Sequence, residues 1–431
     1  MTPQNYFLIS GARSAKNKIL LFYCIIMKIL AIETSCDETA VALVEASGEL
    51  INPSFKIIKS EVASQIKLHA KYGGVVPNLA KREHIKNLPI LLEKISRDYK
   101  SKTLNPKSKN PKLITNYSPL ITDIDAIAVT VGPGLEPALW VGVEFARQLS
   151  KEWKKPLIGV NHMEGHLYSF LLKQKTVSTK LKTLNSKKIS NIKNKSLDIR
   201  DWDLRFPMIA LVVSGGHTIL VLLKSLKEYK KLGETLDDAV GESFDKVARL
   251  LDLPYPGGPE LEKIAKKGDP KSVPFPSPMI NQKNYNFSYS GLKTSVLYYM
   301  RNKSSQMLTN DANNVNKKMW KSGQFDFSEK EKANSAASFQ FAAFNPLVKK
   351  AIRAAQEFGA KTIVIGGGVA ANKNLAKLLK LEIKNSKLKI NLIVPPIKYC
   401  MDNAVMIAVA TYINKFRNKK YPIKADGNLN L

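Results

Sequence analysis

Two of the five histidines in the chain lie four residues apart, in the segment NHMEGHLYSFLL. The apolar residues around them recur with helical spacing, which predicts a helix that carries His162 and His166 on one face. Two imidazoles at this spacing can bind one metal ion. A pair of capping or partly buried histidines is the commoner explanation of the bare spacing, so a metal centre would need a further ligand.

Two carboxylates bear on the metal hypothesis. Asp402, in the segment PPIKYCMDN, could be a third ligand, although an aspartate before the apolar run AVMIAVATYI is also typical of a helix N-cap. Glu164 lies two positions after His162, whereas the zinc-peptidase motif H-E-x-x-H requires a glutamate directly after its first histidine. We therefore expect Glu164 to point away from the metal, which would leave a metallopeptidase without its general base.

Three glycine turns are candidates for binding phosphate. The segment GGGVAAN (366–372) follows a predicted strand and opens a helix, and SGGHT (214–218) and PGGPE (256–260) are further turns of this kind. Tight packing of strand against helix is the alternative. The sequence has neither a P-loop motif nor the acidic strand end of an NAD-binding fold. Asp245 could direct its carboxylate toward the ligand-binding cleft that such turns would line, or could pair on a helix with the neighbouring Lys246 or Arg249.

The predicted elements occur twice. In each copy a buried strand, a polar turn and a second strand come first, and a later strand runs through glycines into a helix, from Pro137 in the first copy and from Ala370 in the second. The sequence therefore predicts two duplicated α/β subdomains that face a central cleft, where ligands commonly bind. The strands are expected at 27–33, 40–45 and 126–130, and again at 208–213, 219–223 and 362–365.

This repeat assigns the first subdomain to residues 27–157 with a C-terminal helix at 403–425, and the second subdomain to residues 158–402. Residues 1–26 are interpreted as an N-terminal extension, with an organelle transit peptide as the alternative. Three polar, lysine-rich stretches without periodicity are predicted to be flexible surface inserts, at residues 100–122, 173–204 and 301–330.

The chain carries 67 Lys and Arg against 36 Asp and Glu, a net charge of +31. This excess favours a polyanionic partner, either nucleic acid or an anionic membrane surface, although a lysine-rich proteome explains it equally well. The apolar run near the start is far shorter than the ~20 residues that span a bilayer, so we expect no membrane association and a cytoplasmic protein. Three cysteines without a C-x-x-C pair are typical of a reducing compartment.

Nine segments occur together and in order in one known family: ILAIETSCDETAVAL, LHAKYGGVVPNLAKREH, GPGLEPALWVG, NHMEGHL, LVVSGGHT, GESFDKVARLLDLPYPGGP, FSYSGLKT, IGGGVAANKNL and CMDNAVMIA. They extend from Met27 to about Tyr412 and closely resemble the TsaD family, the bacterial form of the universal tRNA threonylcarbamoyladenosine synthase subunit. The resemblance implies two duplicated subdomains of the actin-like ATPase (RNase H-like) class. Glu136–Pro137 departs from the Val-Gly that is common in the family, which bears on the start of the helix after GPG.

The resemblance also assigns roles to individual residues. It implies that His162, His166 and Asp402 hold one divalent metal, iron or alternatively zinc. It places Asp37 and Glu38, at the acidic tip of the first hairpin, among the candidate catalytic groups. The substrate-binding positions that it implies are Val212, Val213, Ser214, Gly215, Gly216, Asp245, Gly258 and Asn372.

The activity implied by the resemblance is tRNA N6-adenosine threonylcarbamoyl transfer, from threonylcarbamoyl-AMP to adenine 37 of tRNAs that read ANN codons. TsaB-like and TsaE-like proteins are the expected partners. The alternatives are a metallopeptidase (glycoprotease), an actin-like ATPase or sugar kinase, and a non-catalytic binding scaffold. By residue type alone, His69, His84 and His217 are candidates for the general base.

Overall fold

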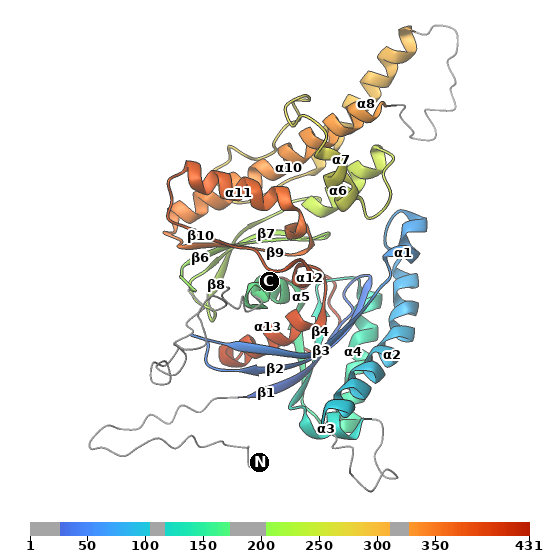
Figure 1. Cartoon of the computed structure of the whole chain (residues 1–431), viewed down its shortest axis with the longest axis vertical. Helices are drawn as coiled ribbons and strands as arrows, with labels where there is room; N and C mark the ends of the chain where they lie inside the picture. The colour runs from blue at the N-terminus through green and yellow to red at the C-terminus, as the bar shows by residue number, and fades with distance from the viewer. Residues whose placement is uncertain (1–25, 104–116, 173–203, 311–326) are drawn as a thin grey trace, which may run out of the picture.

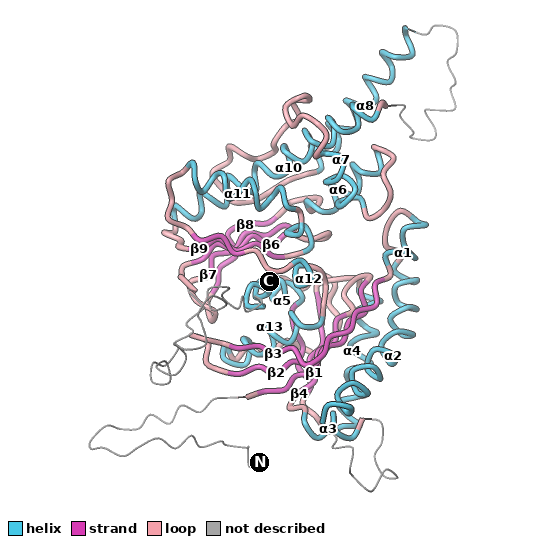
Figure 2. Tube along the Cα trace, in the orientation of Figure 1, coloured by secondary structure: helices cyan, strands magenta, loops and turns pink. Residues whose placement is uncertain are grey.

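The computed structural model describes residues 26–103, 117–172, 204–310 and 327–431, and these contain two five-stranded sheets (Figures 1 and 2). The first sheet has the strand order β3-β2-β1-β4-β5, with β1 antiparallel to β2 and parallel to β4. Its strands are β1 (Met27–Glu33), β2 (Glu38–Ser47), β3 (Ser54–Ser64), β4 (Ala126–Gly132) and β5 (Leu157–Asn161).

The second sheet repeats this arrangement. Its order is β10-β9-β6-β7-β8, and β6 is antiparallel to β7 and parallel to β9, as β1 is to β2 and β4. The duplication predicted from the sequence, two α/β subdomains whose sheets share one strand order, is confirmed. The strands are β6 (Met208–Val213), β7 (Thr218–Leu223), β8 (Tyr229–Glu234), β9 (Thr362–Gly366) and β10 (Asn391–Ile393).

Helices cover the outer face of each sheet and fill the space between the sheets (Figure 1). The outer helices of the first sheet are α2 (Pro77–Thr103), α3 (Ser118–Asp123) and α4 (Glu136–Trp153). Those of the second sheet are α6 (Val240–Leu250), α7 (Gly257–Ala265), α8 (Ser290–Asn310), α10 (Glu329–Glu357) and α11 (Lys373–Asn385). Between the sheets lie α5 (His162–Tyr168) and α13 (Ala404–Arg417), and the short helices α1 (Ile66–His69) and α12 (Ile397–Cys400) precede α2 and α13.

The position of α13 explains its sequence. Every residue from Ala404 to Asn414 is buried, so the helix has no solvated face over these three turns. A helix is apolar on all sides when it packs against apolar neighbours all round, and here those neighbours include α5 and all five strands of the first sheet, within one core cluster that also holds residues of the second sheet. Likewise β1 and β6 are nearly continuous buried runs, because both faces of each sheet are covered.

The structure revises several predicted boundaries. The division after residue 157 falls at the first residue of β5, and because β5 pairs with β4 the first sheet continues to Asn161. Residues 100–103, 118–122, 301–310 and 329–330 are helical rather than loops, as they belong to α2, α3, α8 and α10. The rest of the predicted inserts, at 104–116, 173–203 and 311–326, and nearly all of the N-terminal extension lie outside the described residues.

Two predicted helix starts meet different outcomes. α4 begins at Glu136 with Pro137 at its second position, where the missing N–H of proline costs nothing, so the unusual Glu136–Pro137 suits a helix start. After β9 the chain forms a short 3-10 turn, and α11 begins at Lys373 with Asn372 as its N-cap. The predicted start at Ala370 was therefore wrong by three residues. No helix within the described ranges is long and apolar enough to cross a membrane.

The turn after β9 generates a stability prediction. Gly367 has a φ of +84°, and a Cβ there would lie 2.2 Å from the carbonyl oxygen of Val213. Gly359 also has a positive φ, of +60°, but a Cβ there would meet open space. We expect Gly359→Ala to cost about 1 kcal/mol in the free energy of unfolding. Gly367→Ala should cost at least about 3 kcal/mol, because backbone must also move. Equal losses in urea unfolding would contradict this account.

Candidate metal centre

The histidine pair is positioned by the junction of β5 with α5. Asn161 ends β5 and caps α5, since its side-chain oxygen accepts hydrogen bonds from the backbone N–H groups of Met163 (2.8 Å) and Glu164 (3.4 Å). His162 is therefore the first residue of the helix and His166 lies one turn later on the same face, as predicted. Both side chains are buried in the space between the two sheets.

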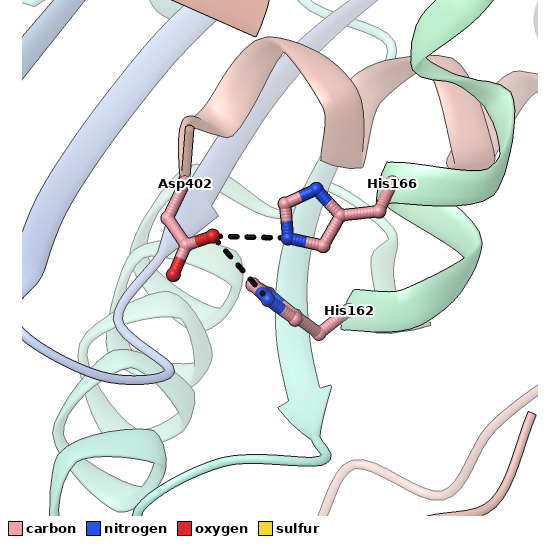
Figure 3. Close-up of side chains that lie close together, drawn as sticks. All are labelled: His162, His166 and Asp402. Atoms are coloured by element: carbon pink, nitrogen blue, oxygen red, sulfur yellow. Dashed lines mark ion pairs between the residues drawn. The ribbon is translucent and has the colours of Figure 1, made fainter. Parts of the chain in front are cut away.

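Asp402 reaches the same point from the loop between α12 and α13 (Figure 3). Its Oδ1 lies 3.0 Å from Nε2 of His166 and 3.5 Å from Nε2 of His162. The N-cap of α13 is Asn403, whose side chain accepts from the N–H of Met406 at 3.0 Å. Asp402 is therefore not the helix cap, and its carboxylate faces the histidines.

The three side chains fit a metal ion. Two imidazole nitrogens and one carboxylate oxygen, all within 4.8 Å of one another, form a donor set suited to zinc or non-haem iron. Tetrahedral ligands at about 2.1 Å from zinc lie about 3.4 Å apart, close to the separations here. Both ring nitrogens of His166 are buried, and within the described ranges neither is aligned for a hydrogen bond. A buried polar atom left in this way is expected where a metal takes its lone pair.

Glu33 supports the site and was missed in the sequence, where it is only the last residue of a strand. Its Oε2 lies 3.0 Å from Nδ1 of His162 and accepts from the hydroxyl of Thr130 at 2.6 Å, while Oε1 accepts from the N–H of Ser35 at 2.6 Å. A carboxylate on Nδ1 fixes the tautomer in which Nε2 is free to bind a metal. The available signal was an acidic residue at the end of a largely apolar strand, and the structure shows that this residue is fully buried.

The charges of the centre stabilise one another. Burial opposes the charged form of His162, but the nearby carboxylates of Glu33 and Asp402 outweigh burial and raise its pKa to about 9. Burial also opposes ionisation of Asp402, yet His162 and the other histidines hold the pKa of that carboxyl well below its usual range. In the metal-free protein His162 is therefore protonated at neutral pH, and a metal must displace this proton.

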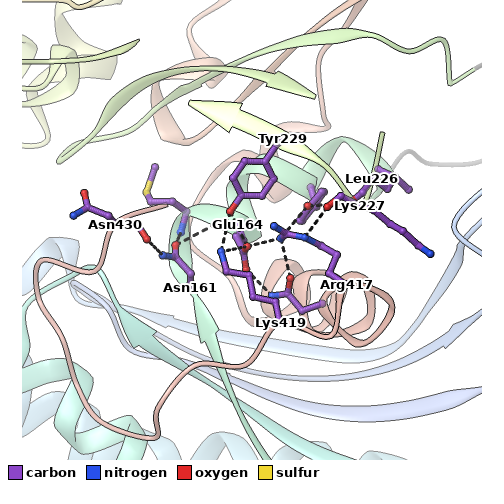
Figure 4. Close-up of polar contacts among 11 residues, drawn as sticks. Asn161, Glu164, Leu226, Lys227, Tyr229, Arg417, Lys419 and Asn430 are labelled. Atoms are coloured by element: carbon purple, nitrogen blue, oxygen red, sulfur yellow. Dashed lines mark hydrogen bonds and ion pairs between the residues drawn. The ribbon is translucent and has the colours of Figure 1, made fainter. Parts of the chain in front are cut away.

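Glu164 does not join the histidines and Asp402, as expected from its position in the motif, and its carboxylate faces Tyr229, Arg417 and Lys419 instead (Figure 4). Its carboxylate is completely buried and accepts hydrogen bonds from Tyr229 (2.9 Å) and Asn414 (2.5 Å). It also pairs with Arg417 at 2.6 Å and Lys419 at 3.2 Å. A carboxylate held by two cations and two further donors cannot act as the general base of a peptidase, and it links α5 to α13 and β8 instead.

The acidic turn between β1 and β2 lies near the centre. Asp37 and Glu38 are both buried, and their charges act on one another. Burial first, and then the carboxylates of Asp37 and Asp402, raise the pKa of Glu38 to about 10. Glu38 therefore carries a proton at neutral pH, so the turn presents one hydrogen-bond donor among its acids.

The expected substrate loop follows β6. Val212 and Val213 are buried at the end of the strand, whereas a Cβ at Gly215 or Gly216 would meet open space. The amino end of α6 packs closely under the turn, because the N–H of Glu242 donates to the carbonyl of Gly215 at 3.0 Å. Ser214 and the two glycines thus form an open backbone surface beside a helix N-terminus, which suits an anion.

The other expected substrate positions lie on the second half of the chain. Asp245 accepts hydrogen bonds from the N–H groups of Gly257 (2.8 Å) and Gly258 (3.2 Å), so it holds the start of α7 rather than pairing with the neighbouring Lys246. Lys246 pairs with Asp238 and Glu242 instead.

Asn372 caps α11 through the N–H of Asn374, at 2.9 Å. Its amide nitrogen donates to Oε1 of Gln340 at 3.0 Å. The side chain of Asn372 is therefore fixed on both its oxygen and its nitrogen.

The three histidines proposed as bases by residue type are not equivalent. His69 is fully buried, bonded to Gln65 (3.0 Å) and accepting from the N–H of Val76. His84 is fully buried between Thr39 (2.8 Å) and the carbonyl of Cys36 (3.0 Å). These two histidines therefore support the first subdomain. His217 differs, because it lines a cavity beside the metal centre.

Comparison with known proteins shows the family of the chain. The family model described as "TsaD: tRNA N6-adenosine threonylcarbamoyltransferase" matches residues 56–105, 112–180 and 189–409. The chain belongs to the TsaD family. Proteins named tRNA N6-adenosine threonylcarbamoyltransferase include one from Thermosipho africanus, 41% identical over 90% of this chain and 94% of that protein. Another, from Bacillus subtilis, is 40% identical over 89% of each chain.

Solved structures outside the TsaD family are far less similar in sequence. The crystal structure of T. kodakarensis HypF is 13% identical, with a TM-score of 0.47 over 93% of this chain and 50% of that one. Full-length HypF in the phosphate- and nucleotide-bound form is also 13% identical in sequence, with a TM-score of 0.48 over 92% of this chain and 48% of that one.

The contact between Glu33 and His162 leads to a prediction for metal binding. Glu33→Gln keeps the shape of the side chain but removes the charge that orients the imidazole, so we expect the affinity for zinc to fall about 10–100-fold. Competition with a chromophoric chelator would measure it. Glu45→Gln, on the same sheet and paired with the exposed Lys56, is the matched control. Equal zinc affinities of the two variants would refute a supporting role for Glu33.

The raised pKa of His162 predicts a pH dependence. A group whose folded pKa is raised from 6.5 to about 9 stabilises the fold fully below pH 6.5, and this contribution is lost as the pH rises to about 9. With a chelator present, the thermal midpoint of the wild type should therefore fall over this window more than that of His162→Gln. Zinc affinity should rise over the same window, because fewer protons must leave. If the thermal midpoints of the wild type and His162→Gln changed in parallel with pH, His162 would not have the raised pKa.

Proposed function

We propose that this protein transfers a threonylcarbamoyl group from threonylcarbamoyl-AMP to N6 of adenine 37 of tRNAs that read ANN codons. The observation that supports this most is the convergence of His162, His166 and Asp402 in a chain of the TsaD family. In the reaction a bond forms between N6 and the carbamoyl carbon, and the bond from that carbon to the phosphate oxygen breaks. AMP leaves with the electron pair, and N6 loses a proton.

The donor would bind on the second half of the chain. Its phosphate would lie on the open turn of Ser214, Gly215 and Gly216, where backbone N–H groups and the start of α6 favour negative charge. Its adenosine would extend toward Gly258 and Asn372. These positions follow the substrate-binding pattern of the family, and the open space at Gly215, Gly216 and Gly258 supports it.

One divalent metal, iron or alternatively zinc, would be held by His162, His166 and Asp402, with Glu33 orienting His162. Bound there, it would supply Lewis acidity next to the developing negative charge. The protonated carboxyl group of Glu38 would donate a hydrogen bond to an oxygen of threonylcarbamoyl-AMP. Asp37 lies beside Glu38 in the same turn and would face the donor with it.

tRNA would be held by the excess of basic residues, since a net charge of +31 favours a polyanion and makes binding weaken with salt. The adenine must leave its stack before its amine can react inside a buried site. TsaB-like and TsaE-like proteins would be the partners, and the cytoplasm the compartment, as the family pattern implies.

Asp402→Asn tests the function most directly. It removes the charge of one proposed ligand at constant shape, so we expect single-turnover transfer from labelled threonylcarbamoyl-AMP to tRNA to fall at least about 100-fold, with tRNA affinity unchanged. Asp252→Asn is the matched control, because its site is a turn with a φ of +58°, which asparagine also tolerates. If Asp402→Asn transfers as fast as Asp252→Asn, the proposed chemistry is wrong.

A further inference from the structure

The cavity that His217 lines lies beside the metal centre, and the roles assigned above leave most of it unused. It has a volume of about 390 Å³ and is lined by Met163 of α5, by His217 and by residues of both subdomains. Met163 directly follows the metal-site residue His162, and the charges of His162 and His166 act on His217. The cavity therefore adjoins the centre where the transferred group would react.

One wall of the cavity is the segment Gly427–Leu431, which folds back onto the first subdomain. The N–H of Asp426 donates to the carbonyl of Val131 at 2.8 Å, and the N–H of Gly134 donates to the carbonyl of Gly427 at 3.2 Å. The amide of Asn161, the cap of α5, donates to the carbonyl of Asn430 at 2.9 Å. These bonds fix the wall to the same strand end that positions the histidines.

The lining is unsuited to phosphate. Among the described residues that form it none is lysine or arginine, although the whole chain carries 67 of them. Its charged members are Glu234 and Asp237. Asp237 accepts hydrogen bonds from Ser288 and Ser290, and Glu234 pairs with Lys231. A phosphate or a carboxylate would meet acidic side chains here, whereas an uncharged group rich in hydrogen-bond donors would be accommodated.

His217 joins this cavity to the expected donor turn. Its N–H donates to Oγ of Ser214 at 3.1 Å, and its carbonyl accepts from the N–H of Ser214 at 2.8 Å. The turn therefore presents open glycines next to α6 and an imidazole to the cavity. Burial first, then the neighbouring histidines, lower the pKa of His217 to about 4, so the ring is neutral and offers one donor and one acceptor.

We propose that this cavity receives the acceptor adenine of tRNA after the base has flipped out of its stack. Adenine is uncharged and offers an amino donor beside ring-nitrogen acceptors, a pattern that the amides of Asn428 and Asn430, the imidazole of His217 and the carboxylate of Glu234 can meet. The cavity is large enough for a purine and its ribose. The donor would then bind on the α6 side of the glycine turn and the acceptor on the other. This inference rests on the proposed function and adds the place where the acceptor binds.

The test is an anticodon stem–loop in which 2-aminopurine replaces the acceptor adenine, bound to the full-length protein with its TsaB-like and TsaE-like partners. Unstacking raises the fluorescence of 2-aminopurine, so base flipping is read without chemistry. Asn428→Phe places a large side chain on the exposed edge of the cavity. Asn385→Phe, at the exposed end of α11, makes the same change elsewhere.

In Asn428→Phe we expect the fluorescence rise at saturating RNA to be at least 5-fold smaller than in the wild type, and the transfer rate to be at least 10-fold lower. Asn385→Phe should match the wild type in both measurements. AMP release from threonylcarbamoyl-AMP without RNA, which reads the donor side, should be unchanged in both. A normal fluorescence rise and normal transfer in Asn428→Phe would overturn the inference and leave the proposed function intact. A wild-type protein that flips the base but never transfers the group would instead overturn the proposed function.

Discussion

The packing of α5 against α13 between the two sheets is the constraint on which the site depends. α5 carries both histidines, and α13 begins directly after Asp402 and Asn403. At the other end of α13, Asn414 and Arg417 hold the buried carboxylate of Glu164. A carboxylate buried in this way is expensive unless it is paired, so the Glu164 contacts fix the two helices in one register. That register sets the distance from Asp402 to the histidines.

The two faces of α5 therefore make different contacts. His162 and His166 meet Asp402 on one side, and Glu164 meets Tyr229, Arg417 and Lys419 on the other. The geometry of the candidate metal site is supported by Glu33 of the first sheet, which holds His162, and by the contacts of Glu164 with α13. Both carboxylates are fully buried and both are held by several donors, as a polar group in a dry interior requires.

Sequence reasoning was strongest where the pattern is local. The bounds of β1 and β6 were correct because uninterrupted apolar runs between turns have one structural explanation, and the duplication followed from their repetition. The helix carrying His162 and His166 followed from the same kind of periodicity. Asp402 was a candidate ligand from its local sequence, and the resemblance to the family favoured that role because the same sequence also fitted a helix cap. The cap is Asn403, one residue later, and spacing cannot distinguish these neighbours.

What could not be read from the sequence depends on contacts between distant segments. Glu33 contacts His162, which lies 129 residues away in the sequence, and neither local sequence indicates that the two side chains meet. The wall formed by Gly427–Leu431 depends on hydrogen bonds to Val131, Gly134 and Asn161, which are hundreds of residues away. The lysine-rich stretches were recognised as polar, but parts of them are helical. α3 lies almost wholly inside one stretch, and α2, α8 and α10 reach into the stretches from segments whose periodicity lies outside them.

The path of the chain has a consequence for how the protein is made. The second sheet is inserted between β5, which completes the first sheet at Asn161, and α13, which covers the inner face of that sheet from Ala404 onward. On a ribosome adding about 5–20 residues per second, roughly 10–50 s pass between the emergence of these two elements. During that interval the part of the inner face formed by β1 and β2, including Ala31 and Ala42, lacks α13, the helix that packs on it. The nascent N-terminal half is therefore a natural client for chaperones until the last helix arrives.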